Sequence, residues 1–196
     1  MPDKMKKSNP YILTLFLAIS ATAISSASAQ TFSDNGDGTA TLTDYPRSIT
    51  GAVEIPSSYN GLSVTSIGPG AFRNCSSLTS VTISDGVVSI GSGTFEYCYA
   101  LKVVVIPPSV SVIDQFAFSN CQSLESITIP EGITLLRSFL FQNCYSLTSI
   151  KIPASVTYVA ESFYNCSALT DIEFEGSVAP EFGGSSFVGV LSQAII

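Results

Sequence analysis

Residues 87–106 read VVSIGSGTFEYCYALKVVVI, and they decide the fold because the same pattern returns at an almost constant interval. Each copy has a Phe, a Cys three residues later and a Leu three residues after that. Steps of 22 or 23 residues separate the cysteines that mark the five copies: Cys75, Cys98, Cys121, Cys144 and Cys166. A period of this size is typical of one supersecondary unit copied along an axis, so the sequence predicts a solenoid.

The end of each unit predicts a short β-strand. The Leu is followed by two apolar positions separated by one other residue, as with Val104 and Ile106, and most of these positions hold β-branched side chains. This alternation is typical of a strand with one buried face. Pro107 and Pro108 then end the strand, since Pro cannot donate to a sheet ladder. We expect the strands of successive units to pair in parallel and to bury columns that no single unit could bury.

The segment between one strand and the next Cys predicts a tight turn. Residues 91–98 are few and rich in Gly, so they can hold at most one turn of α- or 3₁₀-helix, from which Phe95 points inward. Asn precedes four of the five cysteines, and Tyr97 replaces it once. Asn at this place is typical of a turn whose side chain bonds nearby backbone groups. Asn74 and Asn165 also match the glycosylation acceptor pattern.

The regular spacing of the cysteines argues against a disulfide framework. Equivalent residues of neighbouring units stack at about 4.8 Å, and their Cβ vectors run side by side. A disulfide does not favour that arrangement, and a tetrahedral metal site needs ligands that converge. The sequence therefore predicts a buried column of free thiols that act as small hydrophobic groups.

The repeat resembles that of the BspA-type leucine-rich repeat family, whose unit reads I-G-x-x-A-F-x-x-C-x-x-L-x-x-I-x-I-P. The first copy matches it at Ile67, Gly68, Ala71, Phe72, Cys75, Leu78, Val81 and Ile83. The resemblance covers residues 64–176 and implies a right-handed leucine-rich-repeat solenoid. It implies a parallel sheet on the concave face, short α or 3₁₀ turns on the convex face, and attachment to host proteins or to other cells. The fourth copy lacks the Gly, and the fifth drops one residue before Phe163, which places the local turn geometry in doubt.

The N-terminal segment predicts export. A basic start is followed by an apolar run over residues 11–23 and by small residues at 27–29, which predicts a signal peptide of residues 1–29 cleaved after Ala29. The apolar run is shorter than the roughly 20 residues that a transmembrane helix needs. We therefore expect a secreted or cell-surface protein without a transmembrane span in the mature chain.

The remaining ends of the chain depart from the repeat. Residues 30–63 predict an N-terminal β cap, with strands at 39–43 and 53–55. Residues 177–196 begin a partial sixth repeat, in which Ile195 and Ile196 could pair as a short strand.

One turn in the cap allows a minor alternative, a calcium loop formed by Ser33, Asn35, Asp37, Gly38 and Asp44. Its first ligand is wrong, its twelfth is Asp rather than Glu, and no helical pattern flanks it. We expect no metal and no cofactor.

Composition excludes several classes of function. After residue 29, 5 Lys or Arg and 14 Asp or Glu remain, a net charge of −9, which argues against nucleic acid and anionic membranes as partners. The chain contains no His, which excludes His-activated nucleophiles.

The outward side of the repeated strands is the candidate partner-binding surface. Its residues are Ser80, Thr82, Val103, Val105, Ser126, Thr128, Ser149, Lys151, Asp171 and Glu173. Val103 and Val105 could anchor an extracellular protein within a field of hydroxyl groups; alternatively, they are there because β-branched residues suit strands. A glycan is a second candidate ligand, although this face lacks exposed aromatic side chains.

A third interpretation makes Asp171 and Glu173 the acid pair of a glycoside hydrolase. Lys151 stacks beside Glu173 in the expected register, and a cross-strand ion pair explains these residues better. We expect no enzymatic activity.

Overall fold

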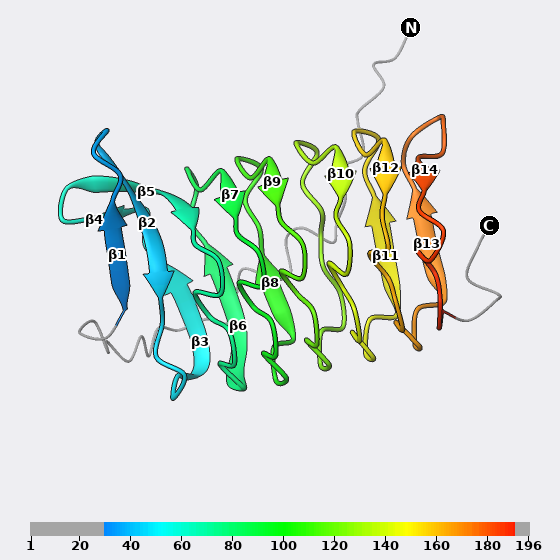
Figure 1. Ribbon diagram of the computed structural model, residues 1–196, viewed down its shortest axis with the longest axis horizontal. Coiled ribbons are helices and arrows are strands. Elements are labelled where there is room, and N and C mark those ends of the chain that lie inside the picture. Colours follow the sequence, from blue (N-terminus) through cyan, green and yellow to red (C-terminus); the bar gives the residue numbers. More distant parts are fainter. Residues whose placement is uncertain (1–29, 191–196) are drawn as a thin grey trace, which may run out of the picture.

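The computed structural model describes residues 30–190, which form a β-solenoid whose coils stack along one long axis (Figure 1). Parallel strands from successive coils pair edge to edge, as the sequence predicts. The predicted strands form the first ladder, which comprises β3 (Thr50–Ile55), β6 (Ser77–Ile83), β8 (Val103–Val105), β11 (Ser149–Ile152) and β13 (Asp171–Phe174). Between β8 and β11 the ladder is reduced to one β-bridge, from Thr128 to Lys151.

A second parallel ladder runs beside the first, and no pattern in the sequence predicted it. It comprises β2 (Thr39–Asp44), β5 (Leu62–Ile67), β7 (Ser89–Ile90), β9 (Val112–Ile113), β10 (Leu135–Leu136), β12 (Tyr158–Val159) and β14 (Glu181–Phe182). The ladder is interrupted once: β2, β5, β7 and β9 belong to one sheet, and β10, β12 and β14 belong to another. From β7 onward each of these strands has two residues, which is too short for an apolar alternation to be visible in the sequence.

The third side of each coil is a chain of hydrogen-bonded turns, here called the turn side. The predicted α or 3₁₀ turns are not confirmed, since the described residues 30–190 contain no helix. The backbone explains why: φ is 65° at Gly70 and 64° at Asn74, and left-handed residues interrupt a right-handed helical run. The amide of Arg73 bonds within its own coil to Gly70, while that of Phe72 donates to Thr94 of the next coil.

Six phenylalanine rings stack through the centre of the solenoid, as the inward orientation of Phe95 predicts. Consecutive ring centroids from Phe72 to Phe187 lie 5.1 to 5.8 Å apart. Tyr45 extends the stack by one more ring, 4.7 Å from Phe72. Phe187 is the last ring of the stack, 5.8 Å from Phe163.

The five cysteines form the predicted buried column of free thiols. Each thiol in the interior of the array donates to the carbonyl oxygen of the phenylalanine in the preceding coil; Cys98, for example, donates to Phe72 at 3.1 Å and Cys121 to Phe95 at 3.2 Å. The column therefore satisfies backbone acceptors as well as filling space.

The predicted strands of the N-terminal region are β2 and β3, and they already form a coil of the solenoid. β2 pairs in parallel with β5, and β3 pairs in parallel with β6. The outer cover is β1 (Thr31–Asp34), antiparallel to β2, together with β4 (Ser58–Tyr59), antiparallel to β5. Phe32 and Tyr59 stack with their ring centroids 4.2 Å apart.

The predicted signal peptide at residues 1–29 and the predicted pairing of Ile195 and Ile196 lie outside the described residues. Within residues 30–190, no helix is long and apolar enough to cross a membrane.

Candidate functional site

The outward side chains of the first ladder form two columns, which together are called the strand face. Strand pairing aligns Ser80 with Val103 and Thr82 with Val105 near one end. At the other end, Ser149 aligns with Asp171 and Lys151 with Glu173, and the bridge adds Thr128 beside Lys151. Ser126 lies two residues before Thr128 and is exposed. The structure thus brings the ten predicted residues onto one surface, with Ser80 and Thr82 half-buried and the others exposed.

Two further residues belong to the strand face and were missed by sequence reasoning. β3 pairs with β6 so that Ala52 lies beside Ser80 and Glu54 beside Thr82. The short strand at 53–55 was visible in the sequence, but its neighbours in the sheet were not. Glu54 adds a carboxylate next to the apolar part of the face.

The valines of β8 are the most apolar part of the strand face. Val103 is 44% exposed and Val105 is 47% exposed, while Val104 between them is buried. A shallow groove lies at the carboxyl end of this region, lined on the strand face by Glu54, Thr82 and Val105 and beyond it by residues 83–85 and 106–108. The surface therefore combines an apolar ridge with neighbouring hydroxyl and carboxylate groups.

An ion pair occupies the other end of the strand face. Lys151 Nζ lies 2.6 Å from Glu173 Oε2, which confirms the predicted cross-strand pair. The hydrogen bond to Glu173, followed by the charge of that carboxylate, raises the pKa of Lys151. Asp171 and Glu173 lie on one strand two residues apart, whereas a glycoside hydrolase places its carboxyl groups on either side of the scissile bond.

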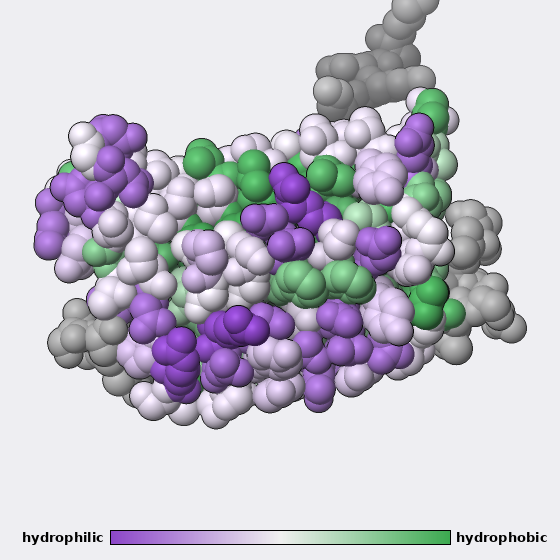
Figure 2. Space-filling view, in the orientation of Figure 1, coloured by the Kyte–Doolittle hydropathy of each residue, from purple (hydrophilic) through white to green (hydrophobic). Residues whose placement is uncertain are grey.

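Exposed apolar residues also occur outside the strand face. Val88, Val112 and Tyr158, on or next to the second ladder, are 45%, 42% and 38% exposed. Figure 2 shows that on the face viewed there, hydrophobic side chains form small groups between hydrophilic ones. No sequence signal marked these positions, because the second ladder itself was not predicted.

The loop considered for calcium is the turn of the β1–β2 hairpin. The Asp37 carboxylate accepts hydrogen bonds from the Thr39 hydroxyl (2.6 Å) and the Thr39 amide (3.0 Å), which lower the pKa of Asp37. Asp34 accepts from the Gly36 amide at 2.7 Å. These carboxylates hold the turn together, and no group of three metal-ligating side chains occurs in the described part of the chain.

Burial makes the thiols poor nucleophiles. It raises the pKa of Cys75 to about 11 and that of Cys166 to about 12. For the fully enclosed Cys121 and Cys144 burial raises the pKa well above its ordinary value, with neighbouring thiols adding to the effect. The thiolate is the reactive form, so the column is chemically inert at neutral pH.

Several solved structures resemble the stacked coils. The leucine-rich repeat protein of T. pallidum has a TM-score of 0.75 at 24% identity over 85% of this chain and 88% of that chain, which shows a shared fold. A leucine rich cell surface protein from Faecalibacterium prausnitzii is 39% identical, with a TM-score of 0.68. That match covers 76% of this chain but 38% of the other, so the chain spans less than half of that protein. A leucine-rich repeat protein from Bacteroides capillosus is 34% identical over 75% of this chain and 94% of that chain, with a TM-score of 0.51.

No curated protein sequence matches the chain significantly. The family model for the BspA type leucine rich repeat region matches six copies, over residues 52–170 and 89–192. Proteins with such repeats are typically surface or secreted binding modules rather than enzymes. Because this model covers more than half of the chain and agrees with the stacked coils, the chain belongs to the BspA-type leucine-rich repeat family.

Proposed function

We propose that this chain is a secreted or cell-surface adhesion module that binds an extracellular protein through the strand face. The observation that carries the proposal is the exposed pair Val103 and Val105 on β8, which lie beside the hydroxyl groups of Ser80 and Thr82 on β6. Partner contact would bury these two side chains, and apolar area removed from water contributes about 25 cal/mol per Å². The predicted signal peptide at residues 1–29 supports the extracellular location.

The strand face also has the polar surroundings that a protein interface requires. Ser80 and Thr82 lie beside the two valines on β6, and Glu54 lies next to Thr82 on β3. Hydroxyl and carboxylate groups of this kind can satisfy the backbone of a bound protein at the rim while the centre is apolar. Host proteins or proteins of other cells are the partners that the family suggests.

The test replaces the apolar pair with charge. The double substitution Val103→Asp and Val105→Asp should lower binding to immobilised extracellular-matrix protein by about tenfold or more, since burial of a charge at the centre of an interface is costly. Binding is measured by surface plasmon resonance with the secreted protein.

The chain offers a matched control. Val88→Asp with Val112→Asp adds the same charge at valines of similar exposure, 45% and 42%, beside the second ladder. This variant should bind as the unaltered protein does. If the two double variants lose binding equally, or if neither loses it, the strand face is not the binding surface.

A further inference from the structure

One position on the turn side holds either Gly or Phe in the same backbone conformation. It lies five residues before the Cys of each coil and is occupied by Gly70, Gly93, Phe116 and Phe139, with φ values of 65°, 60°, 58° and 59°. The fifth repeat has lost this position through its one-residue deletion. The turn is therefore built for a left-handed residue, and Gly is the residue that adopts it without steric cost.

Phe116 and Phe139 adopt this left-handed conformation, although Gly would adopt it without steric cost. A left-handed conformation costs an L-residue with a Cβ about 1–2 kcal/mol. Both side chains are half-buried outside the hydrophobic core, and they stack on each other with centroids 5.3 Å apart and rings inclined by 13°. This stacked pair contributes about 0.5–1.5 kcal/mol beyond its buried area, and Phe139 also contacts Tyr164 edge-on with ring centroids 6.1 Å apart. Strain of this kind concentrates at functional sites.

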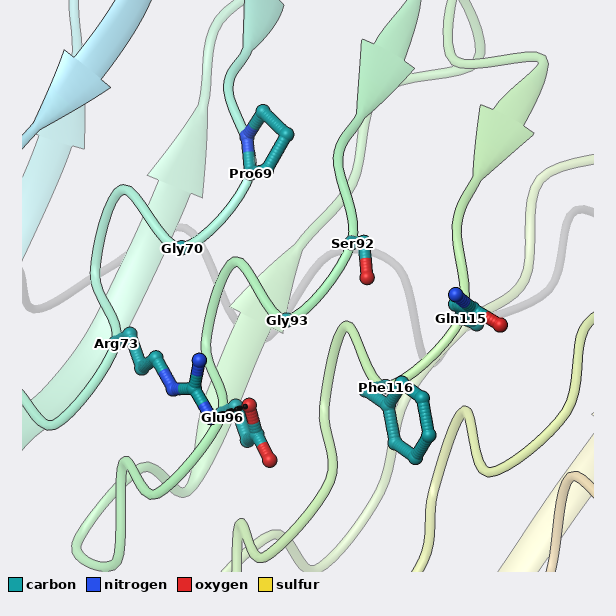
Figure 3. Close-up of a pocket in the computed structure, with 8 residues that line it drawn as sticks. All are labelled: Pro69, Gly70, Arg73, Ser92, Gly93, Glu96, Gln115 and Phe116. Atoms are coloured by element: carbon teal, nitrogen blue, oxygen red, sulfur yellow. Dashed lines mark ion pairs between the residues drawn. The ribbon is translucent and has the colours of Figure 1, made fainter.

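The two glycines open a groove that ends at the ring of Phe116. Gly70 and Gly93 line it, together with Pro69, Arg73, Ser92, Glu96 and Gln115 (Figure 3). Phe139 covers one face of the Phe116 ring, and the coil on the opposite side carries Gly93 where another ring would lie. A Cβ added at Gly93 would meet only the Glu96 side chain within 4 Å. Phe116 thus borders an empty place in an aromatic stack.

Polar side chains surround this empty place. Arg73 Nη2 lies 2.8 Å from Glu96 Oε2, so the charges in the groove are balanced. Figure 3 shows Ser92 and Gln115 at the upper edge of the groove, and Gly93 as bare backbone between Glu96 and Phe116. The groove combines one flat apolar wall with hydroxyl, amide, carboxylate and guanidinium groups at its edges.

We propose that this turn-side groove binds a pyranose ring of a glycan, which stacks on Phe116 and lies over Gly93. A pyranose presents C–H groups on its face and hydroxyl groups on its edge, which matches an aromatic wall with a polar rim. The aromatic side chain of a protein partner fits less well, because it would desolvate the polar groups of Ser92 and Gln115 without offering them hydrogen bonds. This inference does not depend on the strand face, which lies on another side of the coil.

The test uses the secreted protein and four linear hexasaccharides: cello-, laminari-, malto- and chitohexaose. We expect at least one to bind in isothermal titration calorimetry. Phe116→Gly should weaken that binding about tenfold while the Tm is unchanged or raised, because Gly relieves the left-handed strain. A residue with only a structural role would lower the Tm when removed.

A second variant closes the groove instead of removing its wall. Gly93→Phe should extend the stack into the vacant place and abolish binding, since the neighbouring coil carries Phe in the same conformation and an added Cβ meets only the Glu96 side chain within 4 Å. Val103→Asp with Val105→Asp should leave glycan binding unchanged. The proposal fails if no hexasaccharide binds, if either groove variant retains full affinity, or if N-acetyl-phenylalanine amide displaces the glycan.

Discussion

The interior columns and the strand-face columns run along the same coils, but they differ in how much they change from coil to coil. The interior repeats Phe and Cys at every full turn of the array, and all of these side chains are fully buried. The strand face changes from hydroxyl to Val, back to hydroxyl, and then to an ion pair. In a close-packed interior a change of one methylene is felt, whereas most exposed positions tolerate substitution. The interior specifies the architecture, and the strand face is free to specify a partner.

The largest effect is expected from a substitution at the centre of the buried interior. Phe118 is fully buried and stacks between Phe95 and Phe141, so Phe118→Ala should lower the free energy of unfolding by about 3–5 kcal/mol. Val103→Ala on the strand face should change it by no more than about 0.5 kcal/mol. Urea unfolding followed by circular dichroism measures both, and similar losses would show that the two regions do not differ in this way.

The second prediction concerns the thiols. In the folded protein burial raises the pKa of Cys75 to about 11 and of Cys166 to about 12, from an ordinary value of 9.0. Above pH 9 the folded state therefore keeps thiol protons that the unfolded state loses. The free energy of unfolding should keep the full contribution of the protonated thiols below pH 9 and should fall as the pH rises toward 11–12. Urea midpoints between pH 7 and pH 11 measure this fall.

A variant and a reagent isolate the contribution of the thiols from that of other groups. Cys121→Ala should give a shallower decline with pH, since it removes one thiol that must ionise on unfolding. Ellman's reagent should leave the native protein unlabelled at pH 8 and label all five cysteines in urea. Rapid labelling of the native protein would contradict the sealed column.

The smallest effect is expected from a substitution that completes the column of Asn side chains on the turn side. Asn143 donates to Asn120 (3.0 Å) and Asn165 to Asn143 (2.9 Å), but Tyr97 breaks the series at φ 64°. Tyr97→Asn should raise the free energy of unfolding by about 0.5–1 kcal/mol, because Asn tolerates positive φ and gains hydrogen bonds to the neighbouring Asn side chains. This net value allows for the loss of the contact between Arg73 and the Tyr97 ring. Tyr99→Asn is the control, since Tyr99 is exposed and does not have positive φ. Equal effects in the two variants would mean that the Asn column contributes nothing.

The sequence predicted the parts of the molecule that repeat with a strong chemical signature. The Phe and Cys periods predicted the stacked interior, and the alternation around Val104 predicted the outward positions of the strand face. The pair Lys151 and Glu173 followed from register alone. Each of these inferences needed only the spacing of residues of one type.

The parts that were missed depend on backbone conformation. Residues 91–98 read as a helical turn, but positive φ at Gly93 and Tyr97 prevents one. Strands of two residues, such as β7, carry no periodicity. The turn-side groove depends on the positive φ that Gly93 and Phe116 share, which a Phe in the sequence does not indicate.

The hydrogen bonds of the sulfur atoms have a consequence for how the protein meets different surroundings. The thiols of Cys98, Cys121, Cys144 and Cys166 each donate a hydrogen bond to the preceding coil and form no disulfide, so the architecture does not depend on an oxidant. The fold therefore needs no disulfide and no oxidising conditions to form. Once folded, the chain presents no accessible thiol for mispairing with other proteins.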